Sequence, residues 1–205
     1  MAKAAGRPGP EDGRPRYTLR ALSPETWPDF ARLVEAHNGI WGGCWCLAFH
    51  AGNREYRTLE ARRAGKEARV REGRTHAALV YAGADCVGWA QFGSPDELPA
   101  IKNRKNYEAG LDRLPDWRIT CLFVGKGHRK RGAADAAVAG ALGEIARLGG
   151  GTVEGYPEDV AGRKVSGSFL WNGTLGMFER LGFERVRKIG KHKWMVRRTV
   201  AGEEA

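Results

Sequence analysis

The sequence predicts a domain of the α/β class, and three observations support this. Runs of β-type residues alternate with helical patterns along most of the chain. Two of these runs, 75–81 and 86–92, are joined by the short segment AGAD, which is typical of a hairpin. A third run, 117–124, leads through a Gly-bearing loop into a helix.

Length and composition set the domain organisation. A chain of 205 residues suits one well-packed domain, which we expect at 17–200. Residues 1–16 are rich in Gly, Pro and charge and are predicted to form a loose tail, and 201–205 a frayed end. The formal net charge is +10, from 34 Lys and Arg against 24 Asp and Glu, so polyanions and phosphorylated ligands are attracted at long range.

Neither a membrane segment nor a metal site is predicted. The chain has no apolar run of about 18 residues, and its N-terminus lacks an apolar signal core, which predicts a cytoplasmic protein with no membrane partner. The four cysteines, at 44, 46, 86 and 121, form no CxxC pair and have no matched His spacing. We therefore expect no metal, and this spacing is also poor evidence for a disulfide.

The first predicted elements are a strand and two helices. The strand spans 17–21, and Ser23 and Pro24 can start the helix that follows it. Gly39 can end that helix. The second helix, 53–72, is strongly basic, and we expect its arginines to form a solvated face.

After the hairpin the chain continues to alternate. Gly88 in the second hairpin strand indicates a bulge or a close backbone approach. Residues 94–116 are predicted to form a long connection with a short helix near Tyr107. The remaining predicted elements are, in order, strand 117–124, helix 134–148, strand 152–156, a short helix capped by Asn172 or Thr174, and strands 183–189 and 193–199.

The most informative stretch is the loop GKGHRKRGAA between strand 117–124 and the next helix. The first N–H groups of a helix have no intrahelical partner, and the helix dipole adds positive potential there. Gly132 lets the backbone turn, and three cationic residues, 129–131, precede it. The loop is therefore predicted to bind a phosphate or pyrophosphate. Neither the Walker sequence nor the GxGxxG fingerprint occurs in the chain.

Three segments resemble the GCN5-related N-acetyltransferases in the order that this family has. The loop sequence RKRGAA is similar to the family's acetyl-CoA loop, in which Arg or Gln is followed after two residues by Gly and then by Gly or Ala after one more. VGWAQF is similar to the family's strand after a hairpin, and MFERLGF to its YEKxGF segment. CWCL, EGYP and LWNGTLGMFERLGF further resemble one branch of bacterial members.

The resemblance implies a mixed sheet whose central strands, 117–124 and 152–156, splay apart around acetyl-CoA. It implies transfer of the acetyl group to a primary amine on a small molecule or peptide, with no metal. The implied acetyl-CoA-binding residues are Phe123, Val124, Arg129, Lys130, Arg131, Gly132, Ala133, Ala134 and Asn172.

The sequence departs from the family at the groups that usually move protons. Phe178 stands where YEKxGF has the Tyr that commonly protonates the leaving thiolate. Arg118 stands near the position of the glutamate that some members use as a base. The remaining catalytic candidates are Tyr156, at the end of the partner strand, Ser168 and Glu154. We expect Glu154 to be a pocket-lining or salt-bridged carboxylate rather than a base.

The segment IWGGCWCLAFH, residues 40–50, matches neither a helix nor a strand. It is either an aromatic plug that closes the core or a wall of the acceptor pocket. For the second alternative the acceptor-binding candidates are Trp41, Trp45 and Cys46, together with Glu154.

Two other functions remain open from the sequence. A catalytically weak acyl-CoA sensor is suggested by Phe178 and the missing glutamate, and a nucleic-acid-binding protein by the charge of +10. The basic residues are spread over many segments, which disfavours nucleic acid. The loop excludes neither O-acetylation nor a longer acyl chain, and the sequence leaves a homodimer open.

Overall fold

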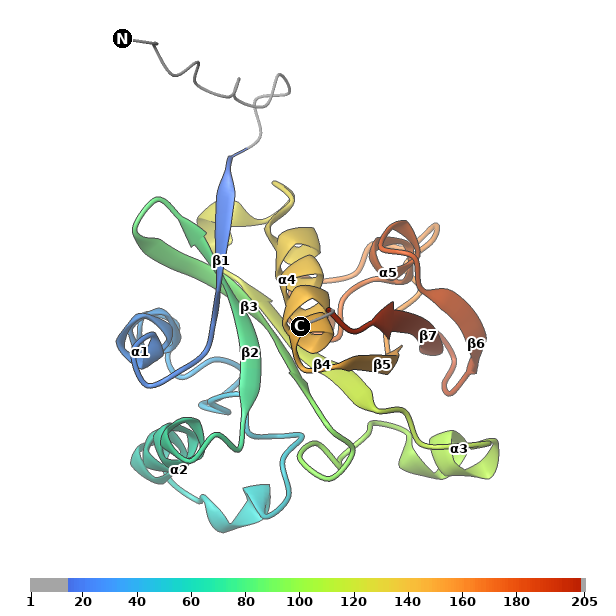
Figure 1. The fold of residues 1–205 in the computed structure, drawn as a ribbon, viewed down its shortest axis with the longest axis horizontal. Coiled ribbons are helices and arrows are strands. Elements are labelled where there is room, and N and C mark those ends of the chain that lie inside the picture. The colour runs from blue at the N-terminus through green and yellow to red at the C-terminus, as the bar shows by residue number, and fades with distance from the viewer. Residues whose placement is uncertain (1–14, 204–205) are drawn as a thin grey trace, which may run out of the picture.

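The computed structural model describes residues 15–203, in which seven strands form one mixed sheet (Figure 1). The sheet order is β1-β2-β3-β4-β5-β7-β6. The strands are β1 Tyr17–Ala21, β2 His76–Ala82, β3 Asp85–Gly93, β4 Trp117–Val124, β5 Gly150–Gly155, β6 Glu184–Lys188 and β7 Trp194–Ala201. Neighbours β4 and β5 are parallel, and all other pairs are antiparallel. The predicted α/β class with a mixed sheet is confirmed.

Five α-helices and three short 3-10 turns connect the strands. The helices are α1 Trp27–Glu35, α2 Leu59–Arg71, α3 Arg104–Ala109, α4 Ala133–Arg147 and α5 Leu175–Arg180. The 3-10 turns are Asn53–Glu55, Lys126–His128 and Gly167–Phe169. The predicted tail 1–16 lies outside the described residues except for its last two, and so do 204 and 205.

Two predicted helix starts are wrong. Helix α1 begins at Trp27 instead of after Ser23, because Ser23 and Pro24 lie in a turn. The Thr26 hydroxyl closes this turn by donating to the Ala21 carbonyl at 2.8 Å. The basic helix begins at Leu59 because Thr58 caps it.

The end of the last strand, β7, and the start of its neighbour β5 also differ from the sequence expectation. Ala201, expected in the frayed end, is the last residue of β7. Its partner in the sheet is Gly150, which extends β5 two residues beyond the predicted start. The pairing with β7 orders these residues.

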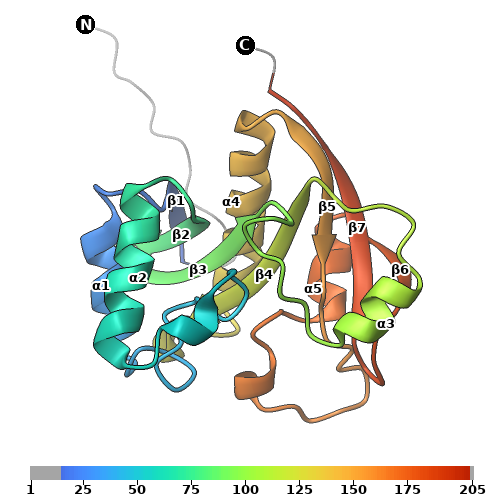
Figure 2. The same ribbon diagram turned by 90° about the horizontal axis from the view of Figure 1, so that it is seen from below.

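The sheet separates two hydrophobic cores. Helices α1 and α2 lie on one face of the sheet and α4 on the other (Figures 1 and 2). Along β2, Ala77 and Leu79 pack on the side of α1 and α2, whereas Ala78 and Val80 pack on the side of α4. This alternation follows from the period of two along a strand. As a result, strands β2, β3 and β4 each present side chains to both cores.

Gly88 in β3 is where strand β4 approaches most closely. A Cβ atom at this position would lie 2.6 Å from the Phe123 carbonyl oxygen. The register shifts beside it, since Val80 pairs with Gly88 and Tyr81 with Cys86. Both the close approach and the bulge predicted at Gly88 are confirmed.

Candidate functional site

Strands β4 and β5 pair over a short distance and then separate. Their register covers Trp117 to Ile119 of β4 and Val153 to Gly155 of β5, although β4 continues to Val124. The segment before α5 partly fills the gap, because the Leu122 N–H donates to the Trp171 carbonyl at 2.7 Å. Asn172 Nδ2 also donates to the Thr120 carbonyl across the gap. Its Oδ1 accepts from the Lys193 ammonium at 2.8 Å.

A cleft of about 610 Å³ opens where the strands separate, between the end of β4, the start of α4 and the segment before α5. Its lining residues are Trp41, Leu122, Phe123, Val124, His128, Arg129, Lys130, Gly132, Ala134, Asp135, Val165, Gly167, Leu170, Gly173, Thr174, Met177 and Arg180. Five of the ten residues of the predicted loop, 125–134, therefore line one cleft together with the end of β4.

The backbone of the loop is shaped at two residues with positive φ. Lys130 has φ 59° and Gly132 has φ 86°. Gly132 is the N-cap of α4, and no atom lies within 4 Å of where its Cβ would be. The glycine is needed here for its conformation, and the space beside it is open toward the cleft.

Val124 presents its backbone to the gap, whereas Phe123 does not. The Gly125 N–H donates to the Val87 carbonyl of β3 at 2.8 Å, whereas the Leu122 N–H points the other way. Successive residues of a strand alternate in this respect, so the N–H and C=O of Val124 face the gap. Arg129 Nε donates to the Val124 carbonyl at 3.0 Å, which holds the guanidinium at the end of β4.

Three of the predicted cofactor-binding residues do not line this cleft. The Arg131 side chain is exposed and borders a separate hollow beside Tyr17. Ala133 is buried against the α4 core. Asn172 is buried in the bridge across the gap.

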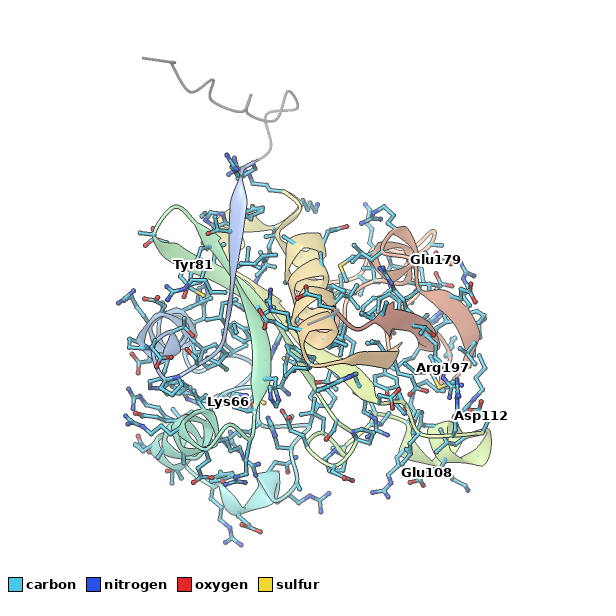
Figure 3. All side chains as sticks on the ribbon, viewed as in Figure 1. Lys66, Tyr81, Glu108, Asp112, Glu179 and Arg197 are labelled. Carbon is cyan, nitrogen blue, oxygen red and sulfur yellow. The ribbon has the colours of Figure 1, made fainter. Side chains whose placement is uncertain are left out.

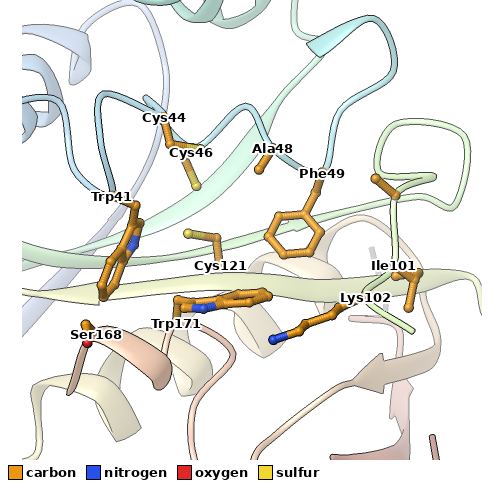
Figure 4. Close-up of a pocket in the computed structure, with 11 residues that line it drawn as sticks. Trp41, Cys44, Cys46, Ala48, Phe49, Ile101, Lys102, Cys121, Ser168 and Trp171 are labelled. Carbon is orange, nitrogen blue, oxygen red and sulfur yellow. The ribbon is translucent and has the colours of Figure 1, made fainter. Parts of the chain in front are cut away.

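A second cavity, of about 380 Å³, lies on the other side of β4 (Figure 4). Its lining residues are Trp41, Cys44, Cys46, Ala48, Phe49, Ala100, Ile101, Lys102, Cys121, Ser168 and Trp171. Trp41 borders both this cavity and the cleft. Cys121 and Leu122 are consecutive on β4 and pack in the two different cores, so the strand itself divides the two spaces.

The segment 40–50 is both a wall and a plug. Trp41, Cys46 and Phe49 line the cavity. Trp45 does not, because its ring is 3% exposed in the core, 6.0 Å from the Trp27 ring.

Helix α2 holds this segment through its basic side chains. Residues 40, 41, 45 and 46 all have positive φ, so the segment cannot satisfy its carbonyls as a regular element would. Arg62 Nη1 donates to the carbonyls of Gly42 and Gly43, each at 3.2 Å. Arg69 Nη2 donates to Ala51 at 2.8 Å. Some of the arginines that were expected to form a solvated face of this helix therefore hold the cavity wall through hydrogen bonds.

Lys66 of α2 is fully buried (labelled in Figure 3). Its ammonium donates to Thr75 Oγ1 at 2.6 Å and to Gln91 Oε1 at 3.0 Å. Burial lowers the pKa of Lys66. The hydrogen bond with Cys46, and then burial, raise the pKa of Cys121 well above its usual value, so Cys121 stays a neutral thiol facing the cavity.

Glu154 and Tyr156 lie in neither lining. Glu154 is fully buried and accepts hydrogen bonds from the hydroxyls of Tyr156 at 2.8 Å and Tyr107 at 2.9 Å. Arg197 Nε donates to its other oxygen at 2.8 Å, and the same guanidinium pairs with Asp112 (Figure 3). Burial, followed by the charge of Glu154, raises the pKa of Tyr156 well above its usual value.

The positions of Phe178 and Arg118 account for the two departures from the family pattern. The Phe178 ring is fully buried and contacts Gly155 of β5 where a Cβ would otherwise lie. Arg118 is buried, and its Nη1 donates to the Leu98 carbonyl at 2.8 Å. Ser168, by contrast, lines the cavity, and its hydroxyl lies 2.9 Å from that of Ser166.

Several lining residues were not identified from the sequence, namely Phe49, Lys102, Cys121, Trp171 and Arg180. Alternation along β4 could have placed Cys121 opposite Leu122. Nothing in the local sequence indicates that Lys102 and Trp171 meet, with the ammonium 5.4 Å from the ring centroid.

Two searches for other kinds of site gave no candidates. Between residues 15 and 203, no three His, Cys, Asp or Glu side chains are grouped so that they could hold a metal ion. No helix within that range is long and apolar enough to cross a membrane.

The sequence matches no protein-family model, and a comparison with curated proteins finds no match. Solved structures are similar throughout the fold. A protein of Desulfovibrio desulfuricans assigned to the GNAT family of acetyltransferases aligns with TM-score 0.52 and 16% identity, over 91% of this chain and 100% of that one. A Salmonella typhimurium protein assigned as an acetyltransferase, solved with its cofactor acetyl-CoA, aligns with TM-score 0.51 and 15% identity, over 92% and 96%.

A third structure, from Corynebacterium glutamicum, is described as histone acetyltransferase HPA2 and related acetyltransferase. It aligns with TM-score 0.50 and 13% identity, over 94% of this chain and 99% of that one. These alignments span nearly the whole of each chain. The chain therefore has the fold of the GCN5-related N-acetyltransferases.

Proposed function

We propose that the chain is an acetyltransferase that binds acetyl-CoA in the cleft and transfers the acetyl group to an amine held in the adjoining cavity. The observation that carries this proposal is the meeting of the two spaces at Trp41, on opposite faces of β4, where the strand separates from β5. A donor and an acceptor bound on the two sides would meet at Cys121 and Leu122.

The start of α4 fits the pyrophosphate of acetyl-CoA. The first turn of this helix offers free N–H groups, and the residues with positive φ at 130 and 132 aim the preceding backbone at the same space. Arg129 and Lys130 add positive charge at the rim. Arg180 is already paired with Asp135 at 2.8 Å, which leaves that carboxylate neutralised.

The gap-facing backbone of Val124 fits the pantetheine arm, which would lie beside β4 as an added strand. The segment at Trp171 already occupies the N–H of Leu122, so this pairing would stop there. The thioester would then emerge next to Cys121, at the cavity.

Acetyl-CoA supplies an activated thioester to this reaction. Transfer forms a C–N bond and breaks the C–S bond, the sulfur keeps the electron pair, and the proton lost by the amine is returned to the thiolate. The two candidate hydroxyls are those of Tyr156 and Ser168. The Ser168 hydroxyl borders the cavity, and the Ser166 hydroxyl connects the Ser168 hydroxyl to solvent. We therefore propose Ser168 as the proton donor.

Titration calorimetry with acetyl-CoA tests the proposal, with Gly132→Asp as the informative variant. Aspartate adds bulk and negative charge where the phosphates would lie, so affinity should fall about a hundredfold, equivalent to about 3 kcal/mol. Gly127→Asp is the control for charge, because it adds the same charge to the same loop outside the cleft lining and also meets no atom within 4 Å. Gly132→Asn is the control for backbone strain, because it places a side chain of the same size at the positive φ of Gly132 without the charge.

Absence of binding by the wild-type protein at millimolar acetyl-CoA would refute the proposal. An equal loss of acetyl-CoA affinity in Gly132→Asp and Gly127→Asp would refute the placement of the phosphates. An acyl-CoA sensor is favoured by one observation, namely that the cavity lining contains neither a carboxylate nor a histidine. Binding without thiol release over a broad amine panel would identify a sensor.

A further inference from the structure

The cavity beside the cleft has aromatic walls from separate parts of the chain (Figure 4). Phe49, from the segment before α2, lies 5.5 Å from the Trp171 ring, measured between centroids. Trp41 closes the side that borders the cleft. At about 30 Å³ for each water-sized group, a volume of about 380 Å³ holds about a dozen non-hydrogen atoms. This space suits one substituted ring.

The lining is unsuited to a positively charged acceptor. It contains no Asp or Glu, and most of its other members are aromatic, aliphatic or thiol side chains. An ammonium group that enters such a space loses hydration without gaining a counter-ion. The amine must in any case be neutral to attack a thioester, and no base lines the cavity to remove its proton. An acceptor whose amine is already neutral at pH 7 loses no hydration of a charge on entering the cavity and needs no base to remove a proton.

Lys102 places one unpaired positive charge at the cavity. Its ammonium lies 5.4 Å from the Trp171 ring centroid, and no acidic side chain of residues 15–203 lies within ion-pair distance of it. Lys193 lies on the same ring at 5.1 Å but is already bound to Asn172, to the Tyr156 carbonyl and, at 3.5 Å, to Glu158. Lys102 is therefore free to pair with an anionic group on a ligand that contacts Trp171.

We propose that the acceptor is an aromatic amine that carries a carboxylate. Its ring would lie between Trp41, Phe49 and Trp171, with its carboxylate at Lys102 and its amine toward Cys121 and the cleft. The nitrogen lone pair of such an amine is delocalised into the ring, so the amine is neutral at pH 7 and needs no base before it attacks. This inference rests on the proposed acetyl transfer and specifies its acceptor.

The test compares three probes that share the aniline ring and differ in the charge at the para position: 4-aminobenzoate, unsubstituted aniline and 4-aminobenzylamine. Binding to the protein saturated with CoA is measured by calorimetry, and thiol release from acetyl-CoA is measured in parallel. We expect 4-aminobenzoate to bind about tenfold more tightly than aniline and 4-aminobenzylamine to bind most weakly. Spermidine, a flexible polycation, should not bind measurably.

Lys102→Glu should reverse the order of the two charged probes, because it reverses the charge that meets them. Lys105→Glu is the matched control, since Lys105 is an exposed lysine of α3 outside the lining and the net charge changes equally. Both side chains are exposed, so neither substitution should alter folding, which circular dichroism can verify.

Preferential binding of spermidine or 4-aminobenzylamine by the wild-type protein would overturn the inference. So would equal effects of Lys102→Glu and Lys105→Glu on the order of the probes. Failure of the acetyltransferase proposal gives a different result, because acetyl-CoA would then not bind, or 4-aminobenzoate would bind without thiol release. Binding of acetyl-CoA without binding of 4-aminobenzoate would reject the acceptor class alone.

Discussion

Single side chains decide which groups are free to react in this site. The Tyr156 hydroxyl is committed to Glu154 in a buried network, whereas the Ser168 hydroxyl is exposed at the cavity. Tyr156 is a candidate from the sequence because it follows the strand that pairs with β4. The side chain nevertheless packs toward Tyr107, at 5.7 Å between ring centroids, and away from both spaces.

Removal of the Ser168 hydroxyl should therefore lower mainly kcat, whereas removal of the Tyr156 hydroxyl should lower mainly the stability of the fold. Ser168→Ala should lower kcat about tenfold or more, as expected for loss of a proton donor, and leave the affinity for acetyl-CoA unchanged. Tyr156→Phe should lower the free energy of unfolding by about 1 kcal/mol and change kcat less than twofold. Thiol release and chemical denaturation give the two readouts. A tenfold fall in kcat for Tyr156→Phe alone would restore Tyr156 as the donor.

His50 makes the stability of the fold depend on pH. Burial, followed by the positive charges of Lys66 and Arg69, lowers the pKa of His50 from 6.5 to about 2. Below pH 6.5 the unfolded chain takes up a proton that the folded chain does not, so folding loses stability as the pH falls. Between pH 7 and pH 5 this single group should lower the free energy of unfolding by about 2 kcal/mol.

His50→Gln removes the titrating group and should flatten this part of the profile. Urea denaturation at several pH values between 5 and 7 measures the slope for both proteins. The readout is the slope, so a general loss of stability in the variant does not affect it. Identical slopes in the two proteins would contradict the assignment.

At the scale of elements, helix α2 is a support for the segment 40–50. Its sequence reads as a polar helix with few apolar anchors, yet Arg62 and Arg69 bind carbonyl groups of the preceding loop. An irregular segment has carbonyls that no helix or sheet ladder satisfies, and guanidinium groups can bind several of them at once. The cavity wall is consequently held by a neighbouring element.

Arg62→Ala should loosen this wall. Loss of its bonds to Gly42, Gly43 and Tyr56 leaves carbonyls unpaired and should cost about 1–3 kcal/mol of stability. Hydrogen exchange should speed up mainly in residues 40–56. Arg71→Ala, on the same helix, removes a surface pair with Glu67 and should cost less than about 1 kcal/mol. Equal rates of hydrogen exchange at residues 40–56 in Arg62→Ala and Arg71→Ala would show that Arg62 does not hold the cavity wall.

At the scale of the whole molecule, the separation of β4 from β5 creates both spaces of the site. The pairing stops at Ile119 and Gly155, and the chain beyond Gly155 turns away to form the segment that carries Ser168, Trp171 and Asn172. Glu154, near the end of β5, binds side chains from α3, from β7 and from Tyr156, the residue that follows β5. This buried network lies at the point where the two strands part.

The sequence by itself determined the strand order along the chain, the extents of β4 and α4 to within a residue, and the position of the loop that is predicted to bind an anion. These features depend on local rules, namely the periodicity of apolar residues, glycines that end helices, and the free N–H groups at the start of a helix. It also identified 40–50 as irregular and Phe178 as a departure from the family pattern. Local composition was sufficient for the first, whereas the second came from the resemblance to the family.

Tertiary structure decided which side chains face the site. It placed Cys121, Lys102 and Trp171 around one cavity, buried Tyr156 and Glu154 in a network, and turned Trp45 into the core. The residues of the cavity come from segments up to about 130 positions apart in the chain, as the numbers 41 and 171 show. Such contacts depend on how strands and loops pack across the sheet, and no period or spacing within one segment encodes them.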